Sequence, residues 1–432
     1  VAGVDSGQSP CGATRWLGSP VLHPDPYFSE APMKTQTLRA AIALTLAASC
    51  AGAAAAAPEA AIAFARDTVI VDTHIDAPTE LLKHWKDLGM DAPGAEFDHP
   101  KAQAGGLDVA FMSIYTSPAQ DADDSARAVA NQMIDAVEAL VQRHPDKFSL
   151  MRSPRDVTAA PGRVLLPLGM ENGAPIGDDL SQLQFFFDRG VRYITLAHSA
   201  NNAISDSSYA RTPTWGGLSP FGEQVVAEMN RLGIMVDVSH LSDAATSRAI
   251  ALSRVPVIAS HSSFRHFTPG FERNISDELA KQVAAKGGVV HVTFGNGFVN
   301  PKSAADTQAY FDAAAKLDAS NAAAKAAGKP VQTAADFDAA WDASHPRHPT
   351  AIDAVLDHVD HGVKLLGIDH VGIGSDFDGV SGDLPQGLAT AADYPNLVEG
   401  LRARGYSDAD LAKLLGGNLL RAWRAVEDGA RR

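Results

Sequence analysis

The fold is decided by the stretch VIVDTHID at residues 69–76, an apolar run rich in Val and Ile that ends in His74 and Asp76. Other apolar runs also end in side chains of a kind that can bind a metal ion: Glu171, His198, His240, His261 and Asp376. Because the C-terminal ends of all strands of a parallel barrel converge on one face, side chains far apart in sequence can meet there around a metal. The pattern therefore predicts a buried metal centre at one end of a barrel.

Eight short apolar runs share the character of this first stretch. They lie at residues 69–76, 107–115, 164–170, 191–197, 234–239, 255–260, 289–294 and 371–375. Because most of them do not alternate with polar residues, they are typical of parallel strands that are buried on both faces. Helix-like stretches lie between them, at 124–143, 221–232, 243–252, 277–286 and 352–366. Eight alternations of strand and helix predict an α/β protein with a (β/α)8 TIM barrel, and apolar helical spacing over 411–426 predicts a segment that closes it.

Residues 303–350 interrupt this alternation with an Ala- and Asp-rich helical sequence that ends in HPRHP at 345–349. The position predicts a helical insertion after the seventh strand. Loops that follow barrel strands lie on the active-site side, so the insertion is either a lid over the site or a surface excursion without a role in it.

The N-terminal region differs from the rest of the chain. Residues 1–32 are rich in Gly, Pro and Ser and predict a disordered or non-native upstream segment. Positive charge, an apolar run and small residues then follow Met33 in that order, which predicts a signal peptide over 33–57, a barrel domain over 58–432, and an exported protein that is periplasmic or secreted. Cys50 follows LAAS at 46–49, which resembles a lipoprotein processing site, so a lipid anchor at Cys50 is the alternative to a soluble product.

Composition limits the ligands. The chain has 432 residues, 45% of them apolar, which is enough for a large core. A net charge of -15 without a basic run argues against nucleic acid and favours a small-molecule or peptide substrate. Since Cys11 and Cys50 both precede the predicted domain, any metal there must be held by imidazole and carboxylate groups.

The spacing within the motifs suits a metal centre. His74 and Asp76 are two residues apart on a strand, so their side chains project to the same face and can bind one cation. Zinc accepts imidazole and carboxylate ligands together, and the two oxygens of a carboxylate such as Glu171 can bridge two ions.

These residues stand in segments that resemble those of the membrane dipeptidase (renal dipeptidase) family. The segments are VDTHIDAP (71–78), GMENG (169–173), RYITLAHS (192–199), DVSH (237–240), PVIASHSS (256–263), RN (273–274) and GIGSDFDG (372–379). They follow the order of the family and extend from about Asp67 to the end of the chain. With the N-terminal signal, the chain resembles a bacterial secreted member of this family.

The resemblance implies a barrel of the metal-dependent amidohydrolase type that hydrolyses the peptide bond of dipeptides with a hydroxide bridging two zinc ions. It places His74 and Asp76 on one ion and His240 and His261 on the other, with Glu171 bridging them, and it implies a homodimer, because relatives are often dimers.

The resemblance also assigns roles in catalysis and substrate binding. His198 contacts the scissile carbonyl, Arg273 binds the terminal carboxylate of the substrate, and Asp376 transfers protons. Asp378 competes with Asp376 for that last role, and a tyrosine of some relatives aligns with Phe298, which lacks the hydroxyl. The remaining histidines considered are interpreted as structural: His84, His99, His266, His291, His358 and His370.

Three other functions compete with the dipeptidase. A related binuclear amidohydrolase could act on N-acyl amino acids or β-lactams. Deacetylases and cyclic amidases of the same fold commonly pair His-x-His on the first strand with a modified Lys on the fourth, whereas this chain has His74-x-Asp76 and no such Lys. A protein that captures zinc or peptides without turnover would need neither Asp376 nor His198.

Overall fold

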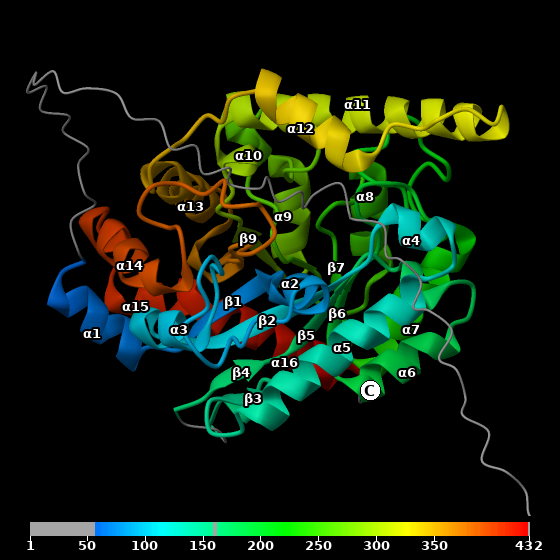
Figure 1. Ribbon diagram of the computed structural model, residues 1–432. Coiled ribbons are helices and arrows are strands. Elements are labelled where there is room, and N and C mark those ends of the chain that lie inside the picture. The colour runs from blue at the N-terminus through cyan, green and yellow to red at the C-terminus, as the bar shows by residue number, and fades with distance from the viewer. Residues whose placement is uncertain (1–56, 159–161, 431–432) are drawn as a thin grey trace, which may run out of the picture.

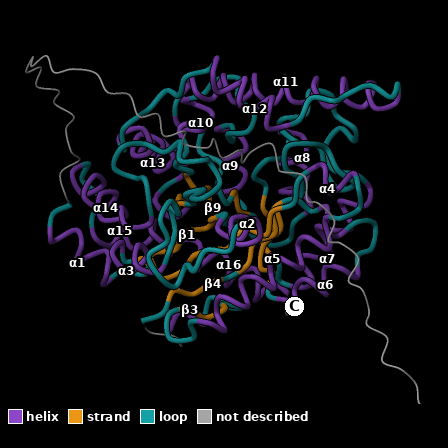
Figure 2. The backbone as a smooth tube through the Cα atoms, in the orientation of Figure 1, coloured by secondary structure: helices purple, strands orange, loops and turns teal. Residues whose placement is uncertain are grey.

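The computed structural model describes residues 57–158 and 162–430. Its centre is a closed barrel of eight parallel strands surrounded by helices (Figures 1 and 2). In barrel order the strands are β1 (Ile70–Ile75), β2 (Leu107–Tyr115), β5 (Leu168–Glu171), β6 (Val191–Thr195), β7 (Met235–Asp237), β8 (Ile258–Ala259), β9 (Val289–Val292) and β10 (Val371–Ile373). The Asp76 amide donates to the Phe377 carbonyl at 2.8 Å and the Asp376 amide to the His74 carbonyl at 3.0 Å, which closes the barrel. The (β/α)8 prediction is confirmed.

One predicted strand, 164–170, is two strands in the structure. β4 (Val164–Leu166) and β5 are separated at Pro167, which has no amide hydrogen to donate to a neighbouring strand. β4 pairs with β2 and also with β3 (Phe148–Leu150), which the sequence did not predict because three residues are too short for a recognisable pattern. β3 and β4 therefore extend the sheet beyond the barrel.

The five predicted helices are present as α5 (Ala126–Arg143), α7 (Pro220–Leu232), α8 (Asp243–Leu252), α9 (Asp277–Ala285) and α13 (Asp353–Leu366). Serine caps begin three of them: the hydroxyls of Ser219, Ser242 and Ser276 accept amide hydrogens of the first turn of α7, α8 and α9. The remaining helices of the barrel layer are α1 (Glu59–Asp67), α2 (Ala77–Lys83), α3 (His99–Gly105), α4 (Pro118–Ala122), α6 (Ser181–Arg189), α14 (Tyr394–Ala403), α15 (Asp408–Ala412) and α16 (Asn418–Ala430).

The last helix, α16, closes the N-terminal end of the barrel. Its Trp423 is fully buried and packs against Phe111 of β2, with ring centroids 5.4 Å apart. Leu419 and Val426 join the same apolar cluster, which includes Val71 of β1. The candidate metal ligands lie at the opposite end of the barrel from this apolar cluster.

The predicted insertion follows the seventh barrel strand, β9. It consists of α10 (Asn296–Val299), α11 (Pro301–Ala326) and α12 (Ala334–Ser344), which lie across the C-terminal ends of the strands (Figure 1). Arg211, from the loop after β6, makes a two-pronged ion pair with Asp312 of α11, with both contacts at 2.7 Å. Tyr209 packs against Phe311 with ring centroids 3.7 Å apart. These contacts hold the insertion down over the strand ends, as the lid interpretation requires.

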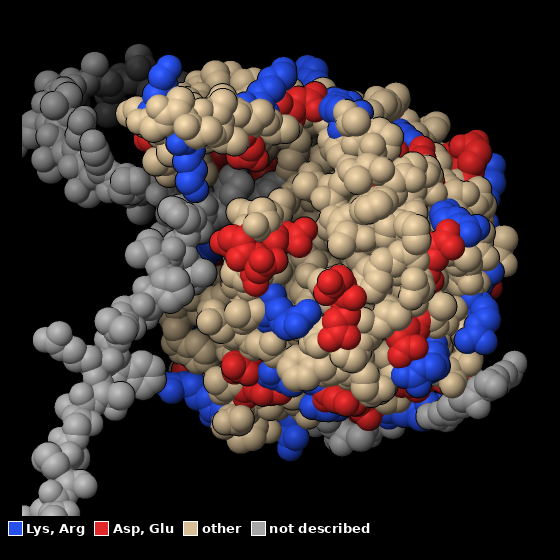
Figure 3. Space-filling model, turned by 90° about the vertical axis from the view of Figure 1, so that its right-hand side faces the viewer, with Lys and Arg blue, Asp and Glu red and all other residues tan. Residues whose placement is uncertain are grey.

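The N-terminal predictions fall outside the described residues, apart from Ala57: they are the segment 1–32, the signal peptide 33–57 and the cysteines at 11 and 50. Within the described part of the chain, no helix is both long and apolar enough to cross a bilayer. Acidic and basic side chains are interspersed on the face that Figure 3 shows.

Candidate metal centre

The strand ends bring the predicted ligands together. His74 lies on β1, Glu171 is the last residue of β5, and His198, His240, His261 and Asp376 follow β6, β7, β8 and β10. All of them are buried, and none is more than 8% exposed. His240 and Asp376 have positive φ angles of 67° and 68°, an unusual backbone for these residue types that is common at functional sites.

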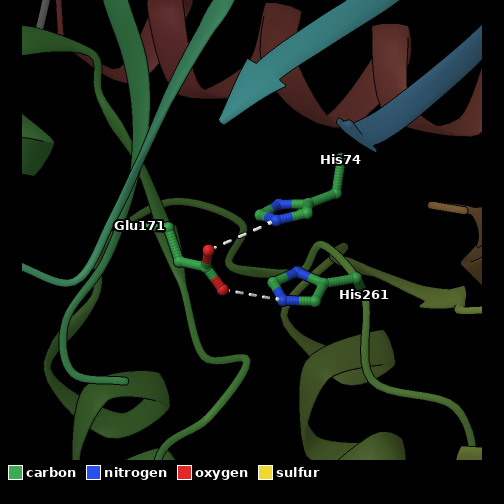
Figure 4. Close-up of side chains that lie close together, drawn as sticks. All are labelled: His74, Glu171 and His261. Carbon is green, nitrogen blue, oxygen red and sulfur yellow. Dashed lines mark hydrogen bonds and ion pairs between the residues drawn. The ribbon is translucent and has the colours of Figure 1, made fainter. Parts of the chain in front are cut away.

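Glu171 occupies the middle of the cluster and presents its two oxygens to different groups (Figure 4). Oε1 lies 3.0 Å from His240 Nε2, 3.2 Å from His261 Nε2 and 3.5 Å from His198 Nε2. Oε2 lies 3.5 Å from His74 Nε2 and accepts the Ser113 hydroxyl at 3.3 Å. The carboxylate is therefore positioned to be shared between two binding positions.

The Oε2 side of Glu171 is the more acidic position. His74 Nε2 lies 3.3 Å from Asp76 Oδ2 and 4.0 Å from Asp376 Oδ1. A Cβ atom on residue 379 would lie 2.3 Å from Asp76 Oδ2 and 2.6 Å from Asp376 Oδ1, so Gly379 is required for these carboxylates to sit where they do. His74 Nε2 is buried and makes no hydrogen bond within the described residues, as is expected of an atom reserved for an ion.

The histidines on the Oε1 side are held neutral. Burial and the charge of Arg273 lower the pKa of His240 well below its ordinary value, and burial together with His74 does the same for His261. Burial lowers the pKa of His198 to about 4. Neutral imidazole is the form that binds metals, so this side of the site is ready for a cation.

The carboxylates respond to burial in opposite ways. Burial alone would raise the pKa of Glu171, but His74, His198 and the hydrogen bonds from His240 and His261 bring it well below its ordinary value. For Asp376, burial and the neighbouring charges of Asp76 and Glu171 raise the pKa well above its ordinary value. The structure thus holds one ionised carboxylate at the centre and one with a high proton affinity at the rim.

A tyrosine that the sequence analysis did not single out orients His74. The Tyr193 hydroxyl lies 2.7 Å from His74 Nδ1 and donates to the Thr73 carbonyl at 3.1 Å. With its own hydrogen on the Thr73 carbonyl, the hydroxyl oxygen can accept a hydrogen bond from Nδ1, which directs Nε2 toward Glu171. A Cβ at position 169 would lie 2.0 Å from Tyr193 Cζ, so Gly169 on β5 makes room for the ring.

A buried aspartate orients His261 in a comparable way. Asp237 Oδ2 accepts the Ser260 hydroxyl at 2.6 Å, and the Ser260 Oγ lies 2.7 Å from His261 Nδ1. Asp237 Oδ1 also accepts the Ser260 amide at 2.8 Å. Asp237 stands in the DVSH motif, and an acidic residue inside a buried strand was the available signal for this role.

The two competing aspartates lie in different surroundings. Asp376 borders the cavity and lies beside the candidate metal ligands. Asp378 instead accepts the backbone amides of Glu96 at 2.7 Å and Phe97 at 3.2 Å. Its carboxylate therefore anchors the loop after β10.

Arg273 is buried deeper than its predicted role suggests. Its Nη2 lies 2.9 Å from His240 Nε2, Nη1 donates to the Ser262 hydroxyl at 3.3 Å, and only 2% of the residue is exposed. The guanidinium stands over the Phe298 ring, 5.0 Å from its centroid. Tyr209 lies beside it, and Arg273 offsets part of the rise that burial causes in the pKa of this tyrosine.

A cavity of about 310 Å³ opens above the cluster. Asp76, Glu171, His198, His240 and Asp376 form its floor, and the insertion supplies much of the remaining lining. Side chains of α11 and α12 that reach it include Asp306, Tyr310, Phe311, Asp338 and Trp341. The insertion is therefore part of the site, and the interpretation as a surface excursion is wrong.

Several histidines interpreted as structural have ordinary partners. His291 Nδ1 lies 2.8 Å from the Ala259 carbonyl, His370 Nδ1 lies 2.8 Å from the Gly288 carbonyl, and His358 Nδ1 accepts the Phe264 amide at 3.0 Å. His266 differs, because it lies near Asp277 and His361 in a second group of metal-binding side chains.

Comparisons with known proteins agree with this geometry. The family described as membrane dipeptidase (peptidase family M19) matches residues 59–432. The chain is 33% identical over 345 residues to dipeptidase aclJ of Aspergillus oryzae, covering 78% of this chain and 71% of that protein. Among solved structures, it resembles the probable dipeptidase PvdM from Pseudomonas aeruginosa, with 30% identity, a TM-score of 0.73, and coverage of 86% and 98%. It also resembles a Rhodobacter sphaeroides metallopeptidase bound to a phosphinate mimic of L-Ala-D-Ala, with 26% identity, a TM-score of 0.66, and coverage of 83% and 100%.

Proposed function

The chain belongs to the membrane dipeptidase family, peptidase family M19, and we propose that it hydrolyses the peptide bond of free dipeptides with two zinc ions held at the strand ends. The observation that carries this proposal is the position of Glu171, whose two oxygens face two separate groups of ligand atoms. A carboxylate placed in this way can bridge two ions, whereas a site for a single ion has no use for the second group of ligand atoms.

We assign the ligands from these distances. His74 and Asp76 hold one ion together with Glu171 Oε2, and His240 and His261 hold the other together with Glu171 Oε1. The position of His74 Nε2, which faces the carboxylates of Asp76 and Glu171, and the neutral state of His240 and His261 support this assignment. Imidazole and carboxylate ligands without thiolate are a set that zinc accepts.

When bound, two zinc ions lower the pKa of a water molecule and polarise the carbonyl that it attacks. Asp376 borders the same cavity, and its raised pKa suits a group that takes a proton and returns it to the leaving amine nitrogen. His198 lies 3.5 Å from Glu171 Oε1 and can donate to the oxygen of the scissile carbonyl as negative charge develops on it.

Arg273 supplies the cation for the C-terminal carboxylate of the dipeptide. Its planar guanidinium can make two charge-assisted bonds to a carboxylate. To do so it must give up its contact with His240 Nε2, the atom that we assign to an ion. Metal loading and carboxylate binding therefore both draw Arg273 away from the position it has in this structure.

A dipeptide library assayed with and without chelator tests the proposed reaction. We expect hydrolysis that a chelator abolishes and that zinc restores. N-acyl amino acids and β-lactams are the matched alternative substrates, and turnover of these without turnover of dipeptides would contradict the proposal.

Metal content tests the ligand assignment. Glu171→Gln should weaken both ions together, whereas His74→Ala should chiefly empty one position and His261→Ala the other. Elemental analysis that finds two zinc ions in Glu171→Gln would remove the bridging role.

We propose further that the enzyme is an exported, bacterial-type member of the family. The support for export is the order of positive charge, apolar run and small residues after Met33. N-terminal sequencing of the mature protein should find a start within a few residues of Pro58. A start at lipid-modified Cys50 would instead mean a membrane-anchored enzyme.

A further inference from the structure

A second group of metal-binding side chains lies outside the barrel mouth. His266 stands in the loop after β8, Asp277 is the first residue of α9, and His361 lies on α13. One ligand atom from each residue lies within 4.8 Å of the others. His361 Nε2 is 2.9 Å from Asp277 Oδ1, and the rings of His266 and His361 stack with centroids 4.2 Å apart and an interplanar angle of 16°.

Aromatic packing fixes the orientation of both imidazoles. Phe267 meets the edge or face of each ring, with centroids 4.9 Å from His266 and 5.6 Å from His361. Phe264 is fully buried and lies 5.4 Å from His361 on another side. This packing restricts the motion of the two rings, which lowers the entropic cost of binding an ion.

An ion pair between His361 and Asp277 accounts for only part of this arrangement. Two imidazoles next to a carboxylate are a suitable ligand set for a divalent transition metal.

We propose that His266, Asp277 and His361 bind a divalent transition-metal ion such as Zn²⁺, at a site separate from the catalytic centre. The affinity is limited by two features. His266 is exposed to solvent, and Asp277 begins α9, where the helix dipole disfavours a cation.

The position of the site gives it a structural consequence. The loop from Phe264 to Ile275 carries Arg273 and closes on itself, because the Arg265 amide donates to the Ile275 carbonyl at 2.9 Å. His266 lies near the start of this loop and Asp277 lies just after its end. An ion bound to both, and to His361, therefore ties the loop to α9 and α13.

Metal stoichiometry of the full chain tests the proposal. The protein is dialysed against buffered micromolar Zn²⁺, and bound zinc per chain is measured by elemental analysis. We expect His266→Ala and His361→Ala each to hold one zinc ion fewer than the wild type. His84→Ala is the matched control, because His84 is an exposed histidine outside both groups, and it should keep the wild-type value.

The difference in zinc content between variant and wild type tests this site independently of the catalytic centre. Failure of the binuclear proposal would lower the zinc content of all proteins equally and leave the difference of one ion intact. Equal zinc content in wild type and His266→Ala would overturn the third site. A loss in His84→Ala as large as that in His266→Ala would show adventitious binding to surface histidines only, which also overturns it. Because His266 is exposed, its replacement leaves the core unchanged, and the melting temperature without added zinc checks this.

Discussion

Tyr193→Phe should weaken one of the two metal positions and spare the other. The Tyr193 hydroxyl is the partner of His74 Nδ1, at 2.7 Å, and both residues are fully buried. The substitution removes one oxygen atom and leaves the ring, so packing against Phe111, 5.3 Å away between centroids, is kept. His74 Nδ1 loses its hydrogen-bond partner, and the Thr73 carbonyl loses the hydrogen bond that it accepts from the Tyr193 hydroxyl.

The magnitude follows from the cost of that unpaired group. Leaving a buried donor without a partner costs about 1–3 kcal/mol, which corresponds to a change of about 5- to 150-fold in an equilibrium constant. Outer partners of metal-binding histidines contribute about 10- to 100-fold to metal affinity, which lies within this range. His261 keeps its own partner, Ser260, so the position that it shares with His240 should change little.

Competition titration with a chromophoric chelator resolves the two dissociation constants. We expect one constant to rise about 10- to 100-fold and the other to stay close to the wild-type value. Tyr406→Phe is the matched control, because the Tyr406 hydroxyl contacts Asp360, at 2.9 Å, away from the metal centre. Unchanged constants in Tyr193→Phe, or an equal loss at both positions, would refute the reasoning that Tyr193 acts through His74.

Three further outcomes follow from the same structure. Asp376→Asn cannot take up a proton, so kcat should fall by about 10² or more while zinc content, measured by elemental analysis, stays unchanged. Arg273→Ala should lower kcat/KM for free dipeptides by about 10² and change that for C-terminally amidated dipeptides little; equal losses on both substrates would mean that Arg273 maintains the site instead. Burial lowers the pKa of His291 to about 4. Between about pH 6.5 and pH 4, His291 is therefore protonated in the unfolded chain and neutral in the folded chain. Lowering the pH through this range should reduce the free energy of unfolding by up to about 3 kcal/mol. Denaturant titrations at these pH values should find a smaller reduction in His291→Asn than in the wild type.

The barrel was predictable because buried parallel strands leave a strong compositional signal. The run at 107–115 has the bounds of β2, and the other predicted runs overlap their strands. The errors came from short-range effects. Pro167 divides one run into two strands, and β3 is only three residues long. Neither the division nor the extra strand changes which residues stand at the barrel mouth.

The site was predictable only as a set of ligand types at strand ends. The fold class predicts that the strand ends converge. The residues that orient the ligands, however, depend on contacts between strands, and the spacing of residues in the sequence does not reveal these contacts. Tyr193 reaches His74 across the barrel, and Asp237 reaches His261 through Ser260. The group around His266 was missed because its members come from three elements and are brought together only by the packing of α9 and α13.

The balance of buried charge connects the metals to the substrate. Asp76, Glu171 and Asp376 are each less than 10% exposed, and Arg273 is buried beside them. His74 also lies among them, and although burial lowers its pKa, Tyr193 and the carboxylates of Asp76 and Glu171 bring that pKa well above its ordinary value. His240 and His261 are neutral because burial lowers their pKa values. Three carboxylates would be costly to bury without more positive charge than Arg273 and His74 supply, and the two divalent ions that we propose would more than offset them. The positive charge that remains, with Arg273 close to it, favours a substrate that brings a negative charge of its own. A free dipeptide does so through its C-terminal carboxylate, and an amidated one does not.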